Sequence, residues 1–192
     1  MTRIAVISAG MGIPSATRLL ADRLADAVVA QLAIADVAGG EEQGATAADV
    51  VELRELAHPL ADNLLTGFPG GPLAAAFDTV EGADALIVVT PVFAASYSGL
   101  FKMFFEALEP GLLRGKPVLL AATAGTARHS LVLEHALRPL FAYLGAVSAP
   151  TAVFAAAEDW GGSSAPGAAL DQRIDRAATD LVRLLTPSAS RR

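Results

Sequence analysis

The sequence has 192 residues, of which 53% are hydrophobic, so the chain is long enough to bury a sizeable core. Its 14 lysine and arginine residues against 20 aspartate and glutamate residues give a net charge of −6, which argues against a protein that coats nucleic acid. The absence of cysteine excludes disulfides, thiolate metal ligands and a cysteine nucleophile, so redox chemistry would need a cofactor.

The N-terminal segment is too short to serve as a secretory signal, because it reaches glycine within ten residues. No apolar stretch is long enough to span a bilayer, and alanine-rich helices packed on a sheet explain the mean hydropathy of +0.48. We therefore expect a cytoplasmic protein with one domain over residues 1–186 and a flexible tail over 187–192.

Strand-like and helix-like segments alternate along the chain. Apolar runs predict strands over residues 4–8, 50–56, 85–90, 117–122 and 147–154, and periodic apolar positions predict helices from residue 15 onward and over 72–81, 98–109, 130–144 and 167–185. Residues 38–44 contain turn formers and are expected to be a loop, and residues 58–71 are expected to be a long connection with at most one helical turn. This alternation predicts an α/β fold with three layers around a doubly wound, five-stranded parallel sheet. The flavodoxin-like strand order 2-1-3-4-5 is the simplest solution.

The loop after the first strand combines two glycines with hydroxyls at Ser8, Ser15 and Thr17. It matches neither the Walker A motif nor the G-x-G-x-x-G pattern. Hydroxyls beside the unpaired amides of a helix N-terminus suit a phosphate monoester, although Ser15 acting only as a helix cap explains the same pattern. Arg18 is the neighbouring cation and a candidate contact for a nucleotide phosphate.

The loop after the third strand, TPVFAASYSGLFK at residues 90–102, is the most informative segment of the chain. It offers a rigid Pro91, an aromatic ring at Phe93 and a row of three hydroxyls ending at Ser98, a mixture that suits a flat ring with polar edges. The first and third strands flank the ligand crevice in this strand order, so both loops are expected to contact one ligand. Ordinary packing at a strand end is the alternative for Phe93 and Tyr97.

The turn Thr123-Ala124-Gly125-Thr126 follows the fourth strand and lets backbone amides approach the polar edge of a flavin, although taken alone it fits any strand-to-helix turn. The helix expected over Ser98–Glu109 is apolar on more than one side, which suggests a contact in a homodimer or homotetramer. We predict no metal site and no residue-centred catalyst, since the histidines lack ligand spacing and no G-x-S-x-G elbow is present.

Three pieces of the sequence together resemble the NAD(P)H-dependent FMN reductase family: Ser8 with PSAT at 14–17, the segment at 90–102, and ATAGTARH at 122–129. The resemblance covers residues 4 to about 154. The continuation into HALRPL at 135–140 is similar to the branch that serves two-component, luciferase-like flavin monooxygenases. The resemblance implies that NAD(P)H passes hydride to N5 of FMN, that the flavin carries the chemistry, and that reduced FMN leaves for the monooxygenase.

The resemblance also implies which residues bind FMN. The phosphate contacts would be Ser8, Ser15, Ala16 and Thr17, the contacts along the ring and ribityl chain Pro91, Val92, Phe93 and Ala94 with Ser98 nearby, and the contacts at the pyrimidine edge Thr123, Ala124 and Gly125. Two alternatives stay open. One is a reductase that keeps FMN bound and reduces a quinone, azo dye or metal oxyanion; the other is a flavodoxin-type electron carrier that does not use NAD(P)H.

Overall fold

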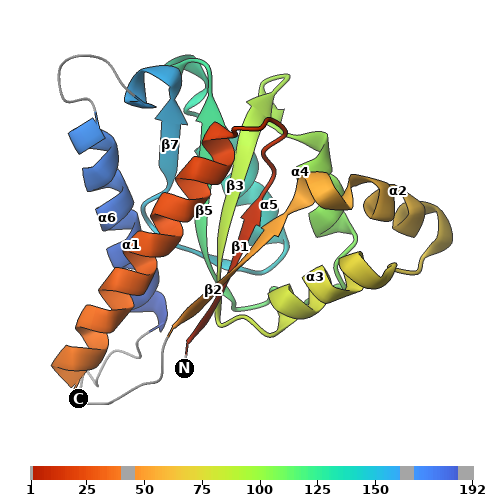
Figure 1. Cartoon of the computed structure of the whole chain (residues 1–192), viewed down its shortest axis with the longest axis horizontal. Helices are drawn as coiled ribbons and strands as arrows, with labels where there is room; N and C mark the ends of the chain where they lie inside the picture. Colours follow the sequence, from red (N-terminus) through yellow and green to blue (C-terminus); the bar gives the residue numbers. More distant parts are fainter. Residues whose placement is uncertain (1, 40–45, 161–166, 186–192) are drawn as a thin grey trace.

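The computed structural model describes residues 2–39, 46–160 and 167–185. A sheet with parallel principal strands lies between two layers of helices (Figure 1). Its principal strands are, in spatial order, β2 (Ala47–Glu52), β1 (Arg3–Ser8), β3 (Ala85–Phe93) and β5 (Pro117–Ala124), with β6 (Val147–Ser148) and β7 (Val153–Ala156) both beside β5. This confirms the predicted order 2-1-3-4-5, because β6 and β7 together take the place of the fifth strand, while β4 (Ser96–Tyr97) only forms a hairpin with β3.

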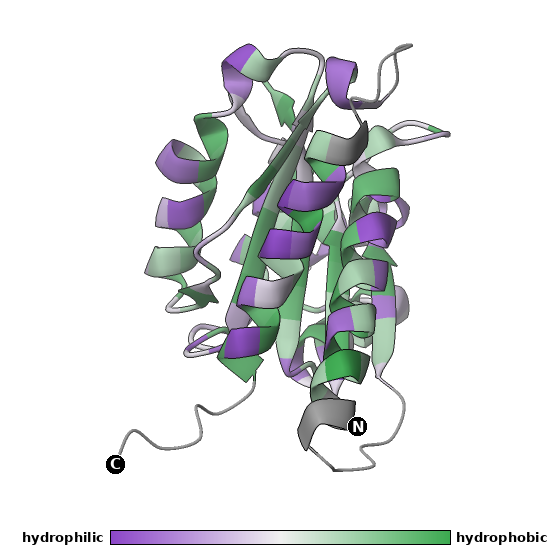
Figure 2. Ribbon diagram, turned by 90° about the vertical axis from the view of Figure 1, so that its left-hand side faces the viewer, coloured by the Kyte–Doolittle hydropathy of each residue, from purple (hydrophilic) through white to green (hydrophobic). Residues whose placement is uncertain are grey.

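The helices are divided between the two faces of the sheet. One face carries α1 (Ala16–Gly39) and α6 (Gly167–Leu185), and the other carries α2 (Ala57–Thr66), α3 (Gly71–Glu81), α4 (Gly99–Glu106) and α5 (Arg138–Tyr143) (Figure 1). Hydrophobic residues run along the strands, and hydrophilic residues lie on the outer sides of the helices (Figure 2). The sheet is therefore buried on both faces, as a parallel sheet requires.

Aromatic side chains fill the layer between α3, α4 and α5. Phe104 lies 5.7 Å from Phe77 of α3, and Phe105 lies 4.9 Å from Phe141 of α5, measured between ring centroids. Phe101, Phe104 and Phe105 are all buried within the chain itself. The apolar character of α4, which suggested a subunit contact, is thus accounted for by packing inside the chain.

Residues 50–71 depart from the prediction. The strand expected over 50–56 begins and ends earlier, as β2, and Leu53–Leu56 form the 3-10 turn η1 that buries Leu53 and Leu56. The loop expected over 58–71 contains the ten-residue helix α2. Pro59 lies in its first turn, where no amide is needed, and Gly67 ends it with a φ of 77°. Turn-forming residues therefore mark the ends of a helix here.

The C-terminal half shows interruptions at prolines. The short 3-10 turn η2 (Ala127–His129) precedes the helix expected over 130–144. Within that range the wider π turn η3 (Leu133–Leu137) is followed by α5, and Arg138 N–H donates to the carbonyl of Leu133. Pro139 follows and lacks an N–H for the regular ladder. Pro150 similarly stands in the gap between β6 and β7, where one strand was expected.

The remaining predicted bounds shift by a few residues or agree. The helix expected over 98–109 ends at Glu106. Residues 38 and 39 of the loop expected over 38–44 belong to α1. Residues 40–44 of that loop and the tail expected over 187–192 lie outside the described residues. The helix predicted over 167–185 is confirmed as α6. In the ranges that the structure describes, every helix is too short or too polar to cross a membrane.

Candidate functional site

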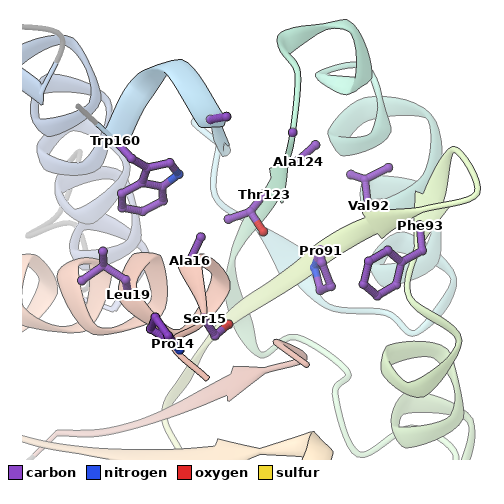
Figure 3. A pocket seen from close by; sticks show the side chains of 12 residues that line it. Pro14, Ser15, Ala16, Leu19, Pro91, Val92, Phe93, Thr123, Ala124 and Trp160 are labelled. Carbon is purple, nitrogen blue, oxygen red and sulfur yellow. The ribbon is translucent and has the colours of Figure 1, made fainter. Parts of the chain in front are cut away.

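A cavity of about 750 Å³ opens at the carboxyl ends of β1, β3 and β5. Its lining residues come from the start of α1, the end of β3, the end of β5 and the turn η4 (Ala157–Trp160). Figure 3 shows Trp160 and Leu19 at one side of this cavity and Phe93 at the other, with Thr123 and Pro91 between them. The volume suits a flat ring system with a short polar extension.

Most of the predicted binding residues line this cavity: Ser15, Ala16, Pro91, Val92, Phe93, Thr123, Ala124 and Gly125. Three segments far apart in the sequence therefore meet at one edge of the sheet, as the strand order predicts. Ser8, Thr17, Ala94 and Ser98 are not among the lining residues, and each has a separate place described below.

The prediction missed lining residues, namely Pro14, Leu19, Ala157 and Trp160. Trp160 is the only tryptophan of the chain and ends η4, the turn that follows β7. It is half-buried, and the guanidinium carbon of Arg23 lies 5.9 Å from its ring centroid, which holds the indole from the α1 side. A large aromatic residue just after a strand was the available signal.

Ser8 lies at the end of β1 with an unpaired hydroxyl. Its side chain is 1% exposed, and Ser8 Oγ has no hydrogen-bond partner among the described residues. An unsatisfied buried hydroxyl is costly, so native proteins keep few of them. Ser8 directly precedes the loop that leads into α1, at the end of the sheet where the cavity opens.

Gly10 and Ser15 fit against each other in the same loop. A Cβ at position 10 would lie 2.0 Å from Ser15 Oγ, so only glycine leaves room for that hydroxyl. Ser15 Oγ accepts a hydrogen bond from Arg18 N at 3.2 Å and thereby caps α1. Ser15 therefore both caps the helix and lines the cavity. The interpretation of Ser15 as a helix cap and its interpretation as a ligand contact are thus compatible.

Thr17 connects two of the loops from behind the cavity. Its Oγ1 lies 2.7 Å from Oγ1 of Thr123, in a buried hydrogen bond between residues 106 positions apart. The two side chains are 3% and 5% exposed. This bond fixes the start of α1 relative to the end of β5, so the two sides of the cavity keep their spacing.

The loop predicted over residues 90–102 is a β-hairpin with a strained tip. Val92 and Phe93 of β3 pair with Tyr97 and Ser96 of β4, and the connecting residues, 94 and 95, are alanines with φ of 47° and 66°. The left-handed region costs an alanine roughly 1 kcal/mol. Phe93 is 50% exposed and lines the cavity, so ordinary packing does not explain it.

The hydroxyls that follow the hairpin have structural partners. Ser98 N donates to Thr90 Oγ1 at 3.0 Å, and Ser98 Oγ accepts from Phe101 N at 3.2 Å, which caps α4. The ring of Tyr97 lies 5.9 Å from that of Phe101, so packing accounts for Tyr97. Ser98 thus holds the hairpin in place against β3.

Arg18 is neutralised by two carboxylates. Its Nε donates to Asp22 at 2.7 Å and its Nη1 to Glu52 at 2.5 Å. The hydrogen bond to Asp22 is the main cause of a raised Arg18 pKa, and partial burial opposes it. The two carboxylates compensate the positive charge of the Arg18 guanidinium. The arrangement therefore gives no support to Arg18 as a nucleotide-phosphate contact.

Among the described residues that line the cavity there is no carboxylate, histidine, lysine or arginine. Among the residues whose positions are described, no three His, Asp or Glu side chains gather closely enough to hold a metal ion. The lining consists of hydroxyls, backbone groups and apolar side chains. It can hold and orient a ring and a phosphate, but it offers no general acid or base of its own.

Comparison with known proteins relates this geometry to a family. Residues 2–161 match the family model of the NADPH-dependent FMN reductases. The chain is 42% identical over 67% of its length to FMN reductase (NADPH) from Pseudomonas aeruginosa, of which 69% is covered. It is 37% identical over 94% of its length to NADH-dependent FMN reductase SfnE from Pseudomonas putida, of which 91% is covered.

A solved structure is similar to this chain in both fold and sequence. An oxidoreductase from Corynebacterium diphtheriae superimposes with a TM-score of 0.87 at 47% identity, over 96% of this chain and 97% of the other. Together with the match of the family model over residues 2–161, these similarities identify the chain as a member of the NADPH-dependent FMN reductase family.

Proposed function

We propose that this chain reduces FMN with NAD(P)H and releases the reduced flavin to a separate monooxygenase. One observation carries the proposal: a hydroxyl-lined helix N-terminus and an exposed aromatic side chain border one cavity, and its lining in the described part of the chain includes no titratable side chain. Such a cavity can bind a phosphorylated ring compound but cannot perform acid–base chemistry by itself. The family membership supports the same activity.

The residues fit FMN at its phosphate end. The unpaired Ser8 Oγ and the Ser15 Oγ held over Gly10 supply hydroxyls beside the first amides of α1, which carry the positive end of the helix dipole. Ala16 adds a backbone amide and no bulk, and Thr17 fixes the loop through Thr123. A phosphate can be held there without a lysine or arginine.

The remaining residues fit the ring. Pro91 and Val92 offer a rigid backbone, and Phe93 offers a half-exposed aromatic face at the cavity edge. Ala124 and Gly125 bring backbone amides close to the polar edge of the ring, since neither has a side chain larger than a methyl group. Ala94 acts from the hairpin tip, by setting the direction of Phe93.

Bound FMN supplies the redox chemistry by accepting two electrons and a proton from NAD(P)H. The contribution of the chain is to bind, orient and polarise. Backbone amides at residues 124 and 125 would stabilise negative charge that develops on the pyrimidine edge. The hairpin that carries Phe93 borders the cavity, and a nicotinamide would approach the flavin from that side.

Release of the flavin is supported by the absence of strong anchors. The phosphate loop contains no free cation in the described residues, because Arg18 is paired with Asp22 and Glu52. One similar protein is named SfnE and another SfnF, both described as NADH-dependent FMN reductases. A luciferase-like monooxygenase is the recipient we propose on the strength of the sequence resemblance. An NAD(P)H-consuming reaction also agrees with the expected cytoplasmic location.

The experiment is anaerobic stopped-flow mixing of flavin-free protein with FMN and either NADH or NADPH. Rapid loss of oxidised flavin absorbance supports the proposal, and no loss with either nucleotide contradicts it. Phe93→Ala is expected to raise the KM for FMN several-fold, whereas Phe68→Ala is the matched control, because Phe68 is 80% exposed and outside the cavity.

Equilibrium dialysis distinguishes a reductase that uses FMN as a substrate from one that keeps FMN bound. A flavin that dialyses away is a substrate, as proposed, whereas a retained flavin favours a reductase of quinones or azo dyes. A flavodoxin-type carrier would bind FMN without rapid bleaching by either nucleotide.

We also propose that copies of the chain associate beside α4. A groove of about 790 Å³ lies there, lined by Leu108, Leu140 and Tyr143 among others, and Tyr143 is 88% exposed. Light scattering would show a dimer or tetramer, and Tyr143→Glu would dissociate it without unfolding the chain. A wild-type monomer at micromolar concentration would contradict this part of the proposal.

A further inference from the structure

A second recess adjoins the flavin cavity across the β3–β4 hairpin. It has a volume of about 420 Å³ and is lined by Ala95 and Ser96 of the hairpin and by Arg128, His129 and His135 of the facing segment. Phe93 lines the flavin cavity, two residues before Ala95, and Gly125 lines it three residues before Arg128. The hairpin and the segment after β5 therefore each contribute residues to both cavities.

The guanidinium of Arg128 lines the recess and has no carboxylate partner among the described residues. Arg128 is exposed, and none of the ion pairs among the described residues involves it. The carboxylate of Glu134 on the same segment is held by Arg138, whose Nε and Nη2 donate to it at 2.6 and 2.9 Å. The unpaired guanidinium of Arg128 and the imidazoles of His129 and His135 therefore line one recess.

The other arginines near the flavin cavity differ from Arg128 in this respect. Arg18 is paired with Asp22 and Glu52, and Arg54 lies 2.9 Å from the second oxygen of Glu52. The phosphate end of the flavin cavity is thus electrically balanced. Positive charge is instead available at the hairpin side, where the ring is expected to be open to a second molecule.

We infer that this recess binds a phosphate group of the nicotinamide dinucleotide, while the nicotinamide ring reaches over the hairpin into the flavin cavity. Guanidinium and imidazole N–H groups, with the hydroxyl of Ser96, are suitable donors for phosphate oxygens. The wall between the two cavities ends in Ala94 and Ala95, whose side chains stop at Cβ. An extended dinucleotide can therefore occupy both spaces.

The backbone of this wall makes a tight two-residue turn. Ala94 and Ala95 both have positive φ, a conformation that alanine adopts only under strain. The favoured two-residue hairpin loop requires positive φ at both connecting residues, so the pairing of Phe93 with Ser96 accounts for this conformation. Here it keeps the hairpin tight between the two cavities.

This inference rests on the proposed function, and the test separates the two. Arg128→Ala and Arg128→Lys are compared with Arg176→Ala, which removes the same charge from an exposed arginine of α6 that has no ion pair among the described residues. Steady-state KM values are measured for NADH and NADPH at saturating FMN. Binding of NADP⁺ is measured by calorimetry, so one readout does not depend on turnover.

Arg128→Ala is expected to raise the KM for the dinucleotide and the dissociation constant of NADP⁺ by roughly five- to tenfold, with the KM for FMN within about twofold. Arg128→Lys should recover part of the loss, and Arg176→Ala should behave as the wild type. An equal loss with NADH and NADPH assigns the pyrophosphate to the recess, whereas a loss confined to NADPH assigns the 2′-phosphate.

The inference is overturned if Arg128→Ala matches Arg176→Ala for both dinucleotides and for NADP⁺ binding. Failure of the proposed function has a different signature, namely a wild-type protein that does not oxidise NAD(P)H in the presence of FMN. The calorimetric comparison still decides the recess in that case, because it needs no electron transfer.

Discussion

Replacing Gly10 with alanine is expected to damage the fold and the flavin site through one contact. The added Cβ would lie 2.0 Å from Ser15 Oγ and 3.2 Å from Thr17 Cβ, and the first separation is impossible. Ser15 would have to turn away from the loop. Its Oγ would then no longer accept the hydrogen bond from Arg18 N, which spans 3.2 Å.

The magnitude follows from the two contacts. Loss of a serine cap costs about 1 kcal/mol, and crowding against Thr17 adds about 1 kcal/mol, so the free energy of unfolding should fall by about 2 kcal/mol. In a chain of 192 residues this corresponds to a decrease in Tm of roughly 4–8 °C. The affinity for FMN should fall about tenfold, because Ser15 is a proposed phosphate contact.

Thermal unfolding of the flavin-free variant measures the first effect, and quenching of FMN fluorescence on titration with protein measures the second. Gly99→Ala is the matched control, since a Cβ at position 99 meets nothing within 4 Å. It should keep its free energy of unfolding within about 0.5 kcal/mol of the wild type. A Gly10→Ala variant that unfolds at the wild-type temperature and binds FMN normally would refute the reasoning.

Four further results are expected. Ser8→Ala should leave the free energy of unfolding unchanged or raise it by up to about 1 kcal/mol, because a buried unpaired hydroxyl is removed, yet it should weaken FMN binding about tenfold in the same titration. Lys116→Met should lower the free energy of unfolding in urea by about 2 kcal/mol, since Lys116 Nζ donates to three carbonyls at the end of α3. The hydrogen bond from Arg138 lowers the pKa of Glu134, so its contribution is present above the ordinary carboxyl pKa and lost as pH falls through the folded value. Glu134→Gln should therefore cost less than about 1 kcal/mol at pH 7 and nothing at about pH 2 in the same urea assay. Emission from Trp160, the only tryptophan, should be quenched as FMN fills the cavity, and unchanged emission at saturating FMN would contradict the assignment of that wall.

The strand order could be predicted because parallel strands buried on both faces appear as uninterrupted apolar runs. Residues 85–91 of β3 are all buried, and so are residues 118–123 of β5. The last helix could be bounded correctly because its apolar positions recur with a helical period. Leu170, Ile174, Ala177 and Leu181 are buried at intervals of four, three and four residues.

Local turn chemistry was ambiguous where a helix and a loop use the same residues. Pro59 suits the first turn of a helix as well as a loop, and Gly67 suits a helix end as well as a turn. Burial of Leu60 against the sheet decides between the two, and this burial depends on residues far along the chain. The sequence pattern therefore could not separate α2 from a loop.

For the site, the strand ends, the hydroxyls of Ser15 and Thr123 and the rigid Pro91 indicated residues that line one cavity in the structure, while their contacts with FMN stay a prediction. Trp160 was missed because the fifth strand appeared to end earlier than β7 does. The unpaired state of Ser8 could not be predicted either, since it depends on which neighbours fail to reach a buried oxygen.

The distribution of charge around the two cavities is consistent with a flavin that exchanges and a nucleotide that docks by its phosphates. At the α1 side, Glu52 holds both Arg18 and Arg54, so the proposed flavin phosphate would be bound by hydroxyls and amides alone. Neutral donors give each hydrogen bond roughly half the strength of a charge-assisted one. At the hairpin side, Arg128 stands without an acidic partner among the described residues. A reductase that passes its flavin to another enzyme needs this asymmetry, because a free arginine at the flavin phosphate would retain the product.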